Sequence, residues 1–186
     1  MPHFISELNI KNFKSCIDTD LNFSPFTALV GYNNAGKSNS LGALQWLIKK
    51  SKLCDSDFYN VSLPIEVIGK VEGITTDILD QLTAAQKSSI EPYIFNDTLK
   101  IKRIQSSPNS APASINLSVW NEEGEWLPNP TGIDNAIKAL LPEPIRIGAM
   151  ENAVDDASKA KTTSTIGKLL ATFLEPVKTA HQQELS

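Results

Sequence analysis

The amino-acid sequence predicts an α/β fold in which a phosphate-binding loop joins a buried strand to a helix. Three observations support this fold class. Apolar and polar residues alternate at Phe4–Ile10, as they do in a half-buried strand. A glycine-rich loop, Gly31–Ser38, directly follows the apolar run Phe26–Val30. From Lys37 to about Lys50, apolar side chains recur at helical spacing.

Size and composition are those of an ordinary globular domain. The chain has 186 residues, of which 41% are hydrophobic and 20% are charged, so it can bury a core and is not of a disordered class. Its net charge of −4 argues against a strongly basic domain that coats nucleic acid. No apolar run is long enough to cross a bilayer, and the N-terminus lacks a signal peptide's features. Cys16 and Cys54 match no metal-ligand spacing, so we expect reduced thiols in a cytoplasmic protein.

Residues 1–50 are expected to contain the strands, the loop and the first helix. A second strand is predicted where one face is formed by Ile17, Thr19, Leu21 and Phe23. Ser24-Pro25 ends this strand. The run Phe26–Val30 is almost entirely apolar, so it is predicted to be a central strand buried on both faces.

Residues 51–143 are predicted to form an α+β insert. Strands are expected at Ile65–Val71, at Leu99–Ile104, at Ile115–Val119 and, after a hairpin turn, at Glu125–Leu127. A capping box at Thr83 and the apolar positions of Ile133–Leu141 predict two helices. Residues 144–186 are expected to add a return strand, Ile145–Met150, and a helix from Thr162. The whole chain is therefore predicted to be one lobe with a mixed sheet and a peripheral β-meander.

The loop Gly31–Ser38 matches the spacing G-x-x-x-x-G-K-[ST], in which each fixed residue has a physical task. Gly31 allows a sharp turn, and Gly36 has no Cβ, so the backbone can approach a phosphate closely. The loop amides and the N-terminus of the following helix point at the same anion. Lys37 supplies a full positive charge, and the hydroxyl of Ser38 suits Mg²⁺, which prefers oxygen ligands.

This motif predicts binding of a nucleoside triphosphate, most directly ATP with Mg²⁺, although the loop alone does not distinguish ATP from GTP. The alternative is a chance match in a turn before a helix, and the flanking strand and helix argue against it. The predicted binding residues are Gly31, Asn33, Asn34, Ala35, Gly36, Lys37, Ser38 and Asn39, with Ser38 also a metal ligand.

Three stretches of the chain resemble the opening of the SMC/RecF-type ABC ATPases: Leu8–Ser15, Leu21–Phe23 and Leu29–Asn39. Within that group the chain is most similar to the OLD-family and Gabija-type AAA ATPases, whose loop often reads G-x-N-N-x-G-K-S-N. Asp57-Phe58 and Ile145–Met150 carry a looser similarity. The resemblance implies an ATPase head that dimerises around ATP, usually in proteins that act on DNA. OLD-family members join such a head to a Toprim nuclease domain.

The sequence lacks three elements that are typical of this family. It has no LSGG-like signature, no apolar strand ending in the Asp-Glu pair of a Walker B motif, and no Toprim carboxylate cluster. In this family those parts lie further toward the C-terminus. We therefore expect an N-terminal lobe that is a fragment, a truncated gene product or one half of a split protein. Its expected partners are nucleotide, a C-terminal ATPase or nuclease region or partner chain, a second copy as a homodimer, and DNA through the full assembly.

Two hypotheses for function follow. The first is an ATP-binding lobe of an OLD-like ATPase concerned with DNA processing or phage defence. Hydrolysis needs a residue that orients the attacking water as well as Mg²⁺ ligands, and the sequence identifies no such carboxylate, so no catalytic residue is assigned. The second is a nucleotide-binding regulatory or interaction module that never hydrolyses ATP, or a degenerate remnant.

Several polar residues have two interpretations. Lys14 matches a basic position that lies near nucleotide in this ATPase group, but an ordinary solvated lysine is favoured. Asn33 and Asn34 either orient a phosphate or the dimer partner, or simply tolerate a left-handed turn.

Two further features lie in the insert. Lys100, Lys102 and Arg103 could form a basic stripe for DNA phosphates, but a solvated strand face is favoured. Trp120 and Trp126 are expected to pack across a hairpin.

Overall fold

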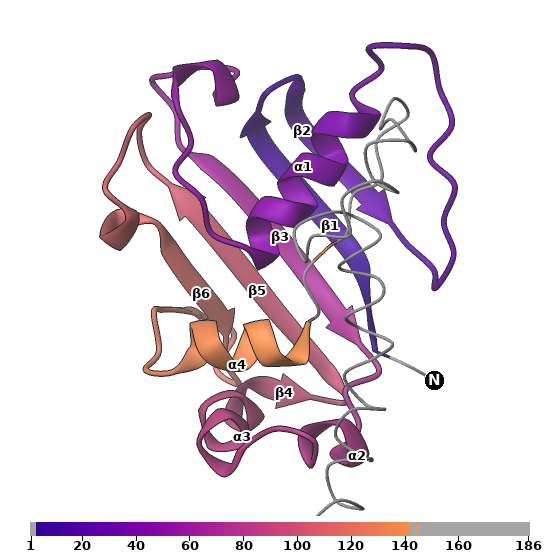
Figure 1. Ribbon diagram of the computed structural model, residues 1–186, viewed down its shortest axis with the longest axis vertical. Coiled ribbons are helices and arrows are strands. Elements are labelled where there is room, and N and C mark those ends of the chain that lie inside the picture. The colour runs from indigo at the N-terminus through magenta and orange to yellow at the C-terminus, as the bar shows by residue number, and fades with distance from the viewer. Residues whose placement is uncertain (1–2, 142–143, 145–186) are drawn as a thin grey trace, which may run out of the picture. The chain divides into compact units, whose positions relative to one another are not determined.

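The structure, a computed structural model, describes residues 3–141 and residue 144 (Figure 1). The chain divides into two compact units, residues 1–143 and residues 144–186, and every element named below belongs to the first. The predicted strand Ile145–Met150 and the predicted helix from Thr162 lie outside the described residues.

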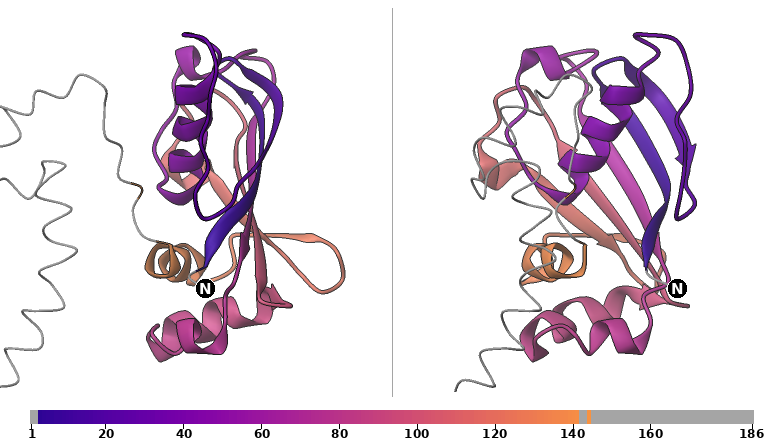
Figure 2. Two further views of the ribbon diagram at one scale, coloured as in Figure 1. Left: turned by 90° about the vertical axis from the view of Figure 1, so that its right-hand side faces the viewer. Right: turned by 45° about the vertical axis from the view of Figure 1, so that its right-hand side comes forward.

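One sheet forms the centre of the first unit. Its strands are β1 (Phe4–Phe13), β2 (Cys16–Asn22), β3 (Ile65–Glu72), β4 (Ile94–Phe95), β5 (Thr98–Gln105), β6 (Asn116–Trp120) and β7 (Trp126–Pro128). Their order is β2-β1-β3-β5-β6-β7, and β4 pairs with β5. The helices are α1 (Lys37–Ile48), α2 (Thr76–Leu79), α3 (Ala84–Ile90) and α4 (Ile133–Leu140), with 3₁₀ turns η1 (Asp55–Asp57), η2 (Glu91–Tyr93) and η3 (Pro112–Ser114). Figure 2 shows α1 and α4 on the same face of the sheet, in agreement with the α/β class.

The register of the strands sorts their side chains onto two faces with a period of two residues. Leu8 pairs with Gly69, Gly69 with Ile101, and Ile101 with Val119, so these residues form one row on the face that α1 covers. Side chains on this face are no more than 2% exposed: Leu8, Ile10, Ile65, Val67, Val71, Leu99, Ile101, Leu117 and Val119. Burial of this apolar face against the helices is the main source of stability.

A glycine in β3 allows α1 to pack close to the sheet. A Cβ atom built on Gly69 would lie 2.5 Å from Cδ2 of Leu47, which is closer than two carbon atoms approach without a bond. Leu47 is itself fully buried. A side chain at position 69 would therefore displace the buried Leu47 side chain from its place between α1 and β3.

Most elements predicted for residues 1–141 are confirmed. Alternation correctly predicts β1, β2, β3, β5 and β6, the hairpin turn predicts β7, and helical spacing predicts α1 and α4. The amide of Gln86 donates a hydrogen bond to Oγ1 of Thr83 over 3.3 Å, so the predicted capping box does begin α3. The elements α2 and β4 were not predicted, because four and two residues are too few to show a period.

The antiparallel pairs β5–β6 and β6–β7 form the predicted β-meander. Trp120 and Trp126 pack edge to face across its last hairpin, with ring centroids 5.1 Å apart, as the sequence predicts. Every pairing among the described strands is antiparallel, so a parallel component of the predicted mixed sheet is not seen in residues 3–141.

The predicted central strand Phe26–Val30 is wrong for the described unit. This segment forms no strand, and Phe26 and Val30 are 88% and 91% exposed. A central strand needs a hydrogen-bonded neighbour on each side and cover on both faces, and no described strand pairs with it. Local contacts hold its start instead, because the Ser24 amide donates to Oγ1 of Thr27 over 2.8 Å.

Lys100, Lys102 and Arg103 do not form the alternative basic stripe, because they lie on opposite faces of β5. The favoured interpretation, a solvated strand face, is wrong for Arg103. Lys100 and Lys102 lie on the face away from α1, with their ammonium groups 5.6 Å and 4.5 Å from the ring centroids of Trp120 and Trp126. Arg103 points to the helix face and is fully buried. The sequence run of three basic residues is therefore not one surface.

Arg103 links the C-terminal end of α1 to α4. Its Nε donates to the carbonyl oxygen of Leu47 over 3.0 Å, and its Nη2 lies 3.3 Å from Oδ1 of Asp134. Burial lowers the pKa of Arg103, and the charge of Asp134 opposes that shift. The pair leaves Nη1 of Arg103 without a hydrogen-bond partner among the described residues.

We expect Asp134→Asn to destabilise the protein more than Arg103→Met. Loss of the aspartate leaves a buried guanidinium without a counter-charge, whereas loss of the arginine leaves a carboxylate that is 37% exposed and can be hydrated. The expected cost of Asp134→Asn is about 2–3 kcal/mol, at the low end for a broken buried pair because water reaches the carboxylate. Urea unfolding of the three proteins measures it. An Arg103→Met variant that is the less stable of the two would contradict this account of the pair.

Candidate phosphate-binding site

Two left-handed residues shape the loop Gly31–Ser38. Asn34 has φ +66° and Gly36 has φ +87°, and the amide of Ala35 donates to the carbonyl oxygen of Tyr32 over 3.2 Å. Gly36 is the N-cap of α1, and its carbonyl oxygen accepts a hydrogen bond from the amide of Ser40 over 2.9 Å. A residue with a side chain is strained at such a φ, so the geometry explains why the motif has glycine at position 36.

Lys37 is folded back over the loop. Its Nζ donates to the carbonyl oxygens of Gly31 and Tyr32 over 2.6 Å and 2.7 Å. No carboxylate of the described residues forms an ion pair with it. Two neutral carbonyl groups thus hold a full positive charge at the loop, where an anion would meet it.

A cavity of about 750 Å³ lies against the loop. It is lined by Ser15, Asn33, Asn34, Ala35, Gly36, Lys37, Ser38 and Asn39. Seven of the eight predicted binding residues therefore share one cavity. The eighth, Gly31, does not line it but accepts the hydrogen bond from Lys37. The volume is within the range usual for small-molecule sites.

A second cavity, of about 650 Å³, shares the lining residues Lys37 and Ser38 with the first. It lies beside α1 and has a largely apolar lining that includes Phe4, Ile5, Phe23, Leu29, Leu41, Leu44, Ile48 and Leu141. Such a lining does not suit a polyphosphate, because a charged group there would lose its hydration without a partner. The polar cavity over the loop is therefore the candidate site.

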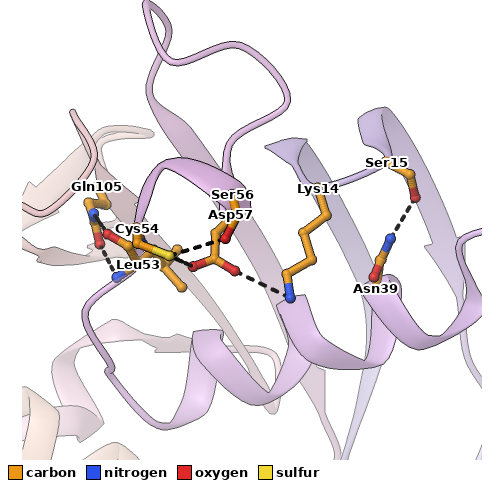
Figure 3. A network of polar contacts seen from close by, with 8 residues as sticks. All are labelled: Lys14, Ser15, Asn39, Leu53, Cys54, Ser56, Asp57 and Gln105. Carbon is orange, nitrogen blue, oxygen red and sulfur yellow. Dashed lines mark hydrogen bonds and ion pairs between the residues drawn. The ribbon is translucent and has the colours of Figure 1, made fainter.

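The turn between β1 and β2 reaches this site through a network of polar contacts (Figure 3). Nζ of Lys14 lies 3.2 Å from Oδ1 of Asp57, and the amide of Lys14 donates to the Asp57 carbonyl oxygen over 2.8 Å. The side chain of Lys14 does not line the cavity over the loop. The structure thus favours a structural role for Lys14 over a direct contact with nucleotide.

Asp57 is the centre of that network. Burial acts to raise the pKa of its carboxyl group, but hydrogen bonds from the amide and thiol of Cys54, and from Lys14, outweigh burial. The net pKa therefore lies below its ordinary value. Cys54 and Cys16 are both free thiols, and Cys16 is buried.

Ser15 is a site residue that the sequence did not reveal. It lines the cavity from the β1–β2 turn, twenty-four positions before Asn39, whose Nδ2 donates to its Oγ over 2.7 Å. In the sequence, Ser15 stands out only as the last residue of the block Leu8–Ser15, which resembles the ATPase family. That resemblance does not indicate a function for Ser15. The contact depends on how the turn packs, which local patterns do not report.

The described residues do not form a preformed metal-binding site. Among them, no group of three or more His, Cys, Asp or Glu side chains is placed to hold a metal ion. Mg²⁺ commonly binds through few protein ligands together with phosphate oxygens and water, so the hydroxyl of Ser38 in the cavity fits that chemistry.

None of the helices in residues 3–141 is both long and apolar enough to span a membrane.

We expect the Asp57 network to be sensitive to acid. Because the folded-state pKa is lowered, the carboxylate stabilises the fold above its unfolded-state pKa of about 3.9, and this stabilisation is lost as pH falls through the lower folded value. Asp57→Asn should therefore be less stable than the wild type at pH 7, and the difference should shrink below about pH 4. Urea unfolding across pH measures this, with the exposed Asp77→Asn as control. A difference that stays constant down to pH 2 would contradict it.

Comparison with known proteins gives two matches. A family described as AAA ATPase domain matches residues 4–140. The chain is also 42% identical over 183 residues to a protein named Old nuclease from Escherichia phage P2. That alignment covers 98% of this chain and 31% of the phage protein, so the chain spans less than a third of this relative's length.

Proposed function

Because the chain belongs to the AAA ATPase domain family, we propose that it binds ATP with Mg²⁺ at Gly31–Ser38. The observation that carries this proposal is the geometry of Lys37, whose ammonium group lies within the loop and has no carboxylate partner among the described residues. A phosphate oxygen is a stronger acceptor for this ammonium group than the two neutral carbonyls that it now contacts. Asn33, Asn34 and Ala35 add loop surface that faces the same anion.

Gly36 and Ser38 also have tasks in this proposal. Gly36 lets the backbone approach the phosphates, and the N-terminus of α1 supports their negative charge. The hydroxyl of Ser38 would hold Mg²⁺, which commonly binds through few protein ligands together with phosphate oxygens and water. When bound, the metal ion neutralises charge on the phosphates. The likeness of the loop region to the SMC/RecF-type ABC ATPases is the support for an ABC-like head.

We further propose that the chain is the N-terminal, ATP-binding lobe of an OLD-like ATPase in DNA processing or phage defence. Its similarity to a phage protein named a nuclease supports this setting. The proposed partners are a C-terminal ATPase or nuclease region, a second copy, and DNA through the full assembly. Phe26 and Val30, which are 88% and 91% exposed in the segment just before the loop, leave apolar surface open to further polypeptide there. A cytoplasmic setting belongs to the same proposal.

A second candidate function is a nucleotide-binding module that does not hydrolyse ATP. The observation in its favour is that no carboxylate lines the phosphate cavity in the part of the chain that the structure describes. Without a group to orient water, an ATP-binding site lacks one of the parts on which phosphoryl transfer depends. The two candidate functions share the same ATP-binding site and differ in whether ATP is hydrolysed there.

We expect Lys37→Ala to lose most of its affinity for Mg-ATP, by about 100-fold or more, because a charge-assisted contact to phosphate disappears in a site built for an anion. The change in stability should be below about 0.5 kcal/mol, as is usual for a partly exposed side chain. Calorimetric titration with Mg-ATP measures affinity, and Lys52→Ala, which removes an exposed lysine outside the loop, is the control. Equal affinity in Lys37→Ala and Lys52→Ala would refute the assignment of the site.

The chain of 186 residues should release no more phosphate from Mg-ATP than its Lys37→Ala variant does. The reason is that charge stabilisation and water positioning are incomplete in the described residues. A sensitive phosphate-release assay at several protein concentrations makes the comparison. A Mg²⁺-dependent rate that the Lys37→Ala change removes would show that the chain holds a complete catalytic set.

A further inference from the structure

The turn between β1 and β2 places a serine hydroxyl beside the start of α1. Of the described residues that line the phosphate cavity, Ser15 is the one that comes from outside Asn33–Asn39. A Cβ atom built on Gly36 would lie 3.2 Å from Oγ of Ser15. The hydroxyl group therefore reaches the residue that caps α1, where the loop amides and the helix N-terminus point at an anion.

The hydrogen bond with Asn39 uses the Ser15 hydroxyl as an acceptor and leaves its proton available. Nδ2 of Asn39 is the donor and Oγ of Ser15 is the acceptor, at 2.7 Å. A serine hydroxyl has one proton and two lone pairs, so the proton of Ser15 remains for a second partner. The cavity that Ser15 lines is the place where such a partner would be a phosphate oxygen.

The backbone of the turn is strained and is held in place by many contacts. Lys14 in the turn and Asn12 near the end of β1 have φ +51° and +60°, a conformation that costs a residue such as lysine about 1 kcal/mol or more and that asparagine tolerates better. The amide and the ammonium group of Lys14 both contact Asp57. The side chain of Asn12 donates to the carbonyl oxygens of Asn60 and Leu63 over 2.9 Å and 2.7 Å. Strain that is maintained in this way is characteristic of functional sites.

We propose that Ser15 is a nucleotide-binding residue that donates its hydroxyl proton to a phosphate oxygen at the N-terminus of α1. Asn39 is then a positioning residue, which acts on nucleotide by orienting Ser15 through its side-chain amide. This inference rests on the proposed function, and it adds to the site a residue from outside the loop motif. It also assigns Asn39 a task other than direct contact with the phosphates.

Calorimetric titration of the full chain with Mg-ATP tests this. Ser15→Ala should bind Mg-ATP about tenfold more weakly, as expected for loss of a hydrogen bond to a charged acceptor. Ser62→Ala, in an exposed loop, is the matched control and should bind as the wild type does. Thermal unfolding of each variant should be unchanged, since Ser15 is exposed and its removal creates no cavity.

A double-mutant cycle separates the two roles. Asn39→Ala should weaken binding, and the double variant Ser15→Ala/Asn39→Ala should bind no more weakly than Ser15→Ala alone, because Asn39 acts through Ser15. Losses that multiply in the double variant would overturn the positioning role of Asn39. A Ser15→Ala affinity within twofold of the wild type, with binding lost in Lys37→Ala, would overturn the role of Ser15 while leaving the proposed function intact. A wild-type chain that does not bind Mg-ATP would overturn both.

Discussion

The contact between Leu47 of α1 and Gly69 of β3 is the constraint on which the rest of the structure depends. Because β3 has no side chain at this point, α1 lies close to the sheet and Leu47 is fully buried. The N-terminal end of the same helix carries Gly36, Lys37 and the phosphate cavity. Its C-terminal end gives the Leu47 carbonyl oxygen to Arg103. This packing contact therefore belongs to the helix from which both the site and the buried ion pair are built.

The candidate site is made of two parts that the sequence separates by some fifteen residues. The loop supplies the ammonium group, the amides and the start of α1, and the β1–β2 turn supplies Ser15. Asp57 holds that turn through Lys14, so a residue outside the site sets the position of a residue within it.

Local sequence patterns predicted what depends on local physics. The period-two strands, the Thr83 cap and the loop spacing are of this kind, because neighbouring residues decide them. The prediction of a central strand at Phe26–Val30 is wrong because an apolar run indicates only that its side chains would be stable if buried. It does not indicate whether a neighbouring strand is present to pair with it. Arg103 was grouped with Lys100 and Lys102 because it directly follows Lys102 in the sequence. In a strand alternate residues share a face, so Arg103 lies with Ile101 on the buried face of β5. Ser15 was missed because its task arises from a tertiary contact.

The most direct test of the account is a crystal structure of the chain with Mg²⁺ and a non-hydrolysable ATP analogue. The account predicts triphosphate density in the cavity over Gly31–Ser38, with Nζ of Lys37 moved from the carbonyl oxygens of Gly31 and Tyr32 to a phosphate oxygen. It also predicts the metal ion at the hydroxyl of Ser38. A nucleotide bound elsewhere, with Lys37 still on the two carbonyl oxygens, would contradict it.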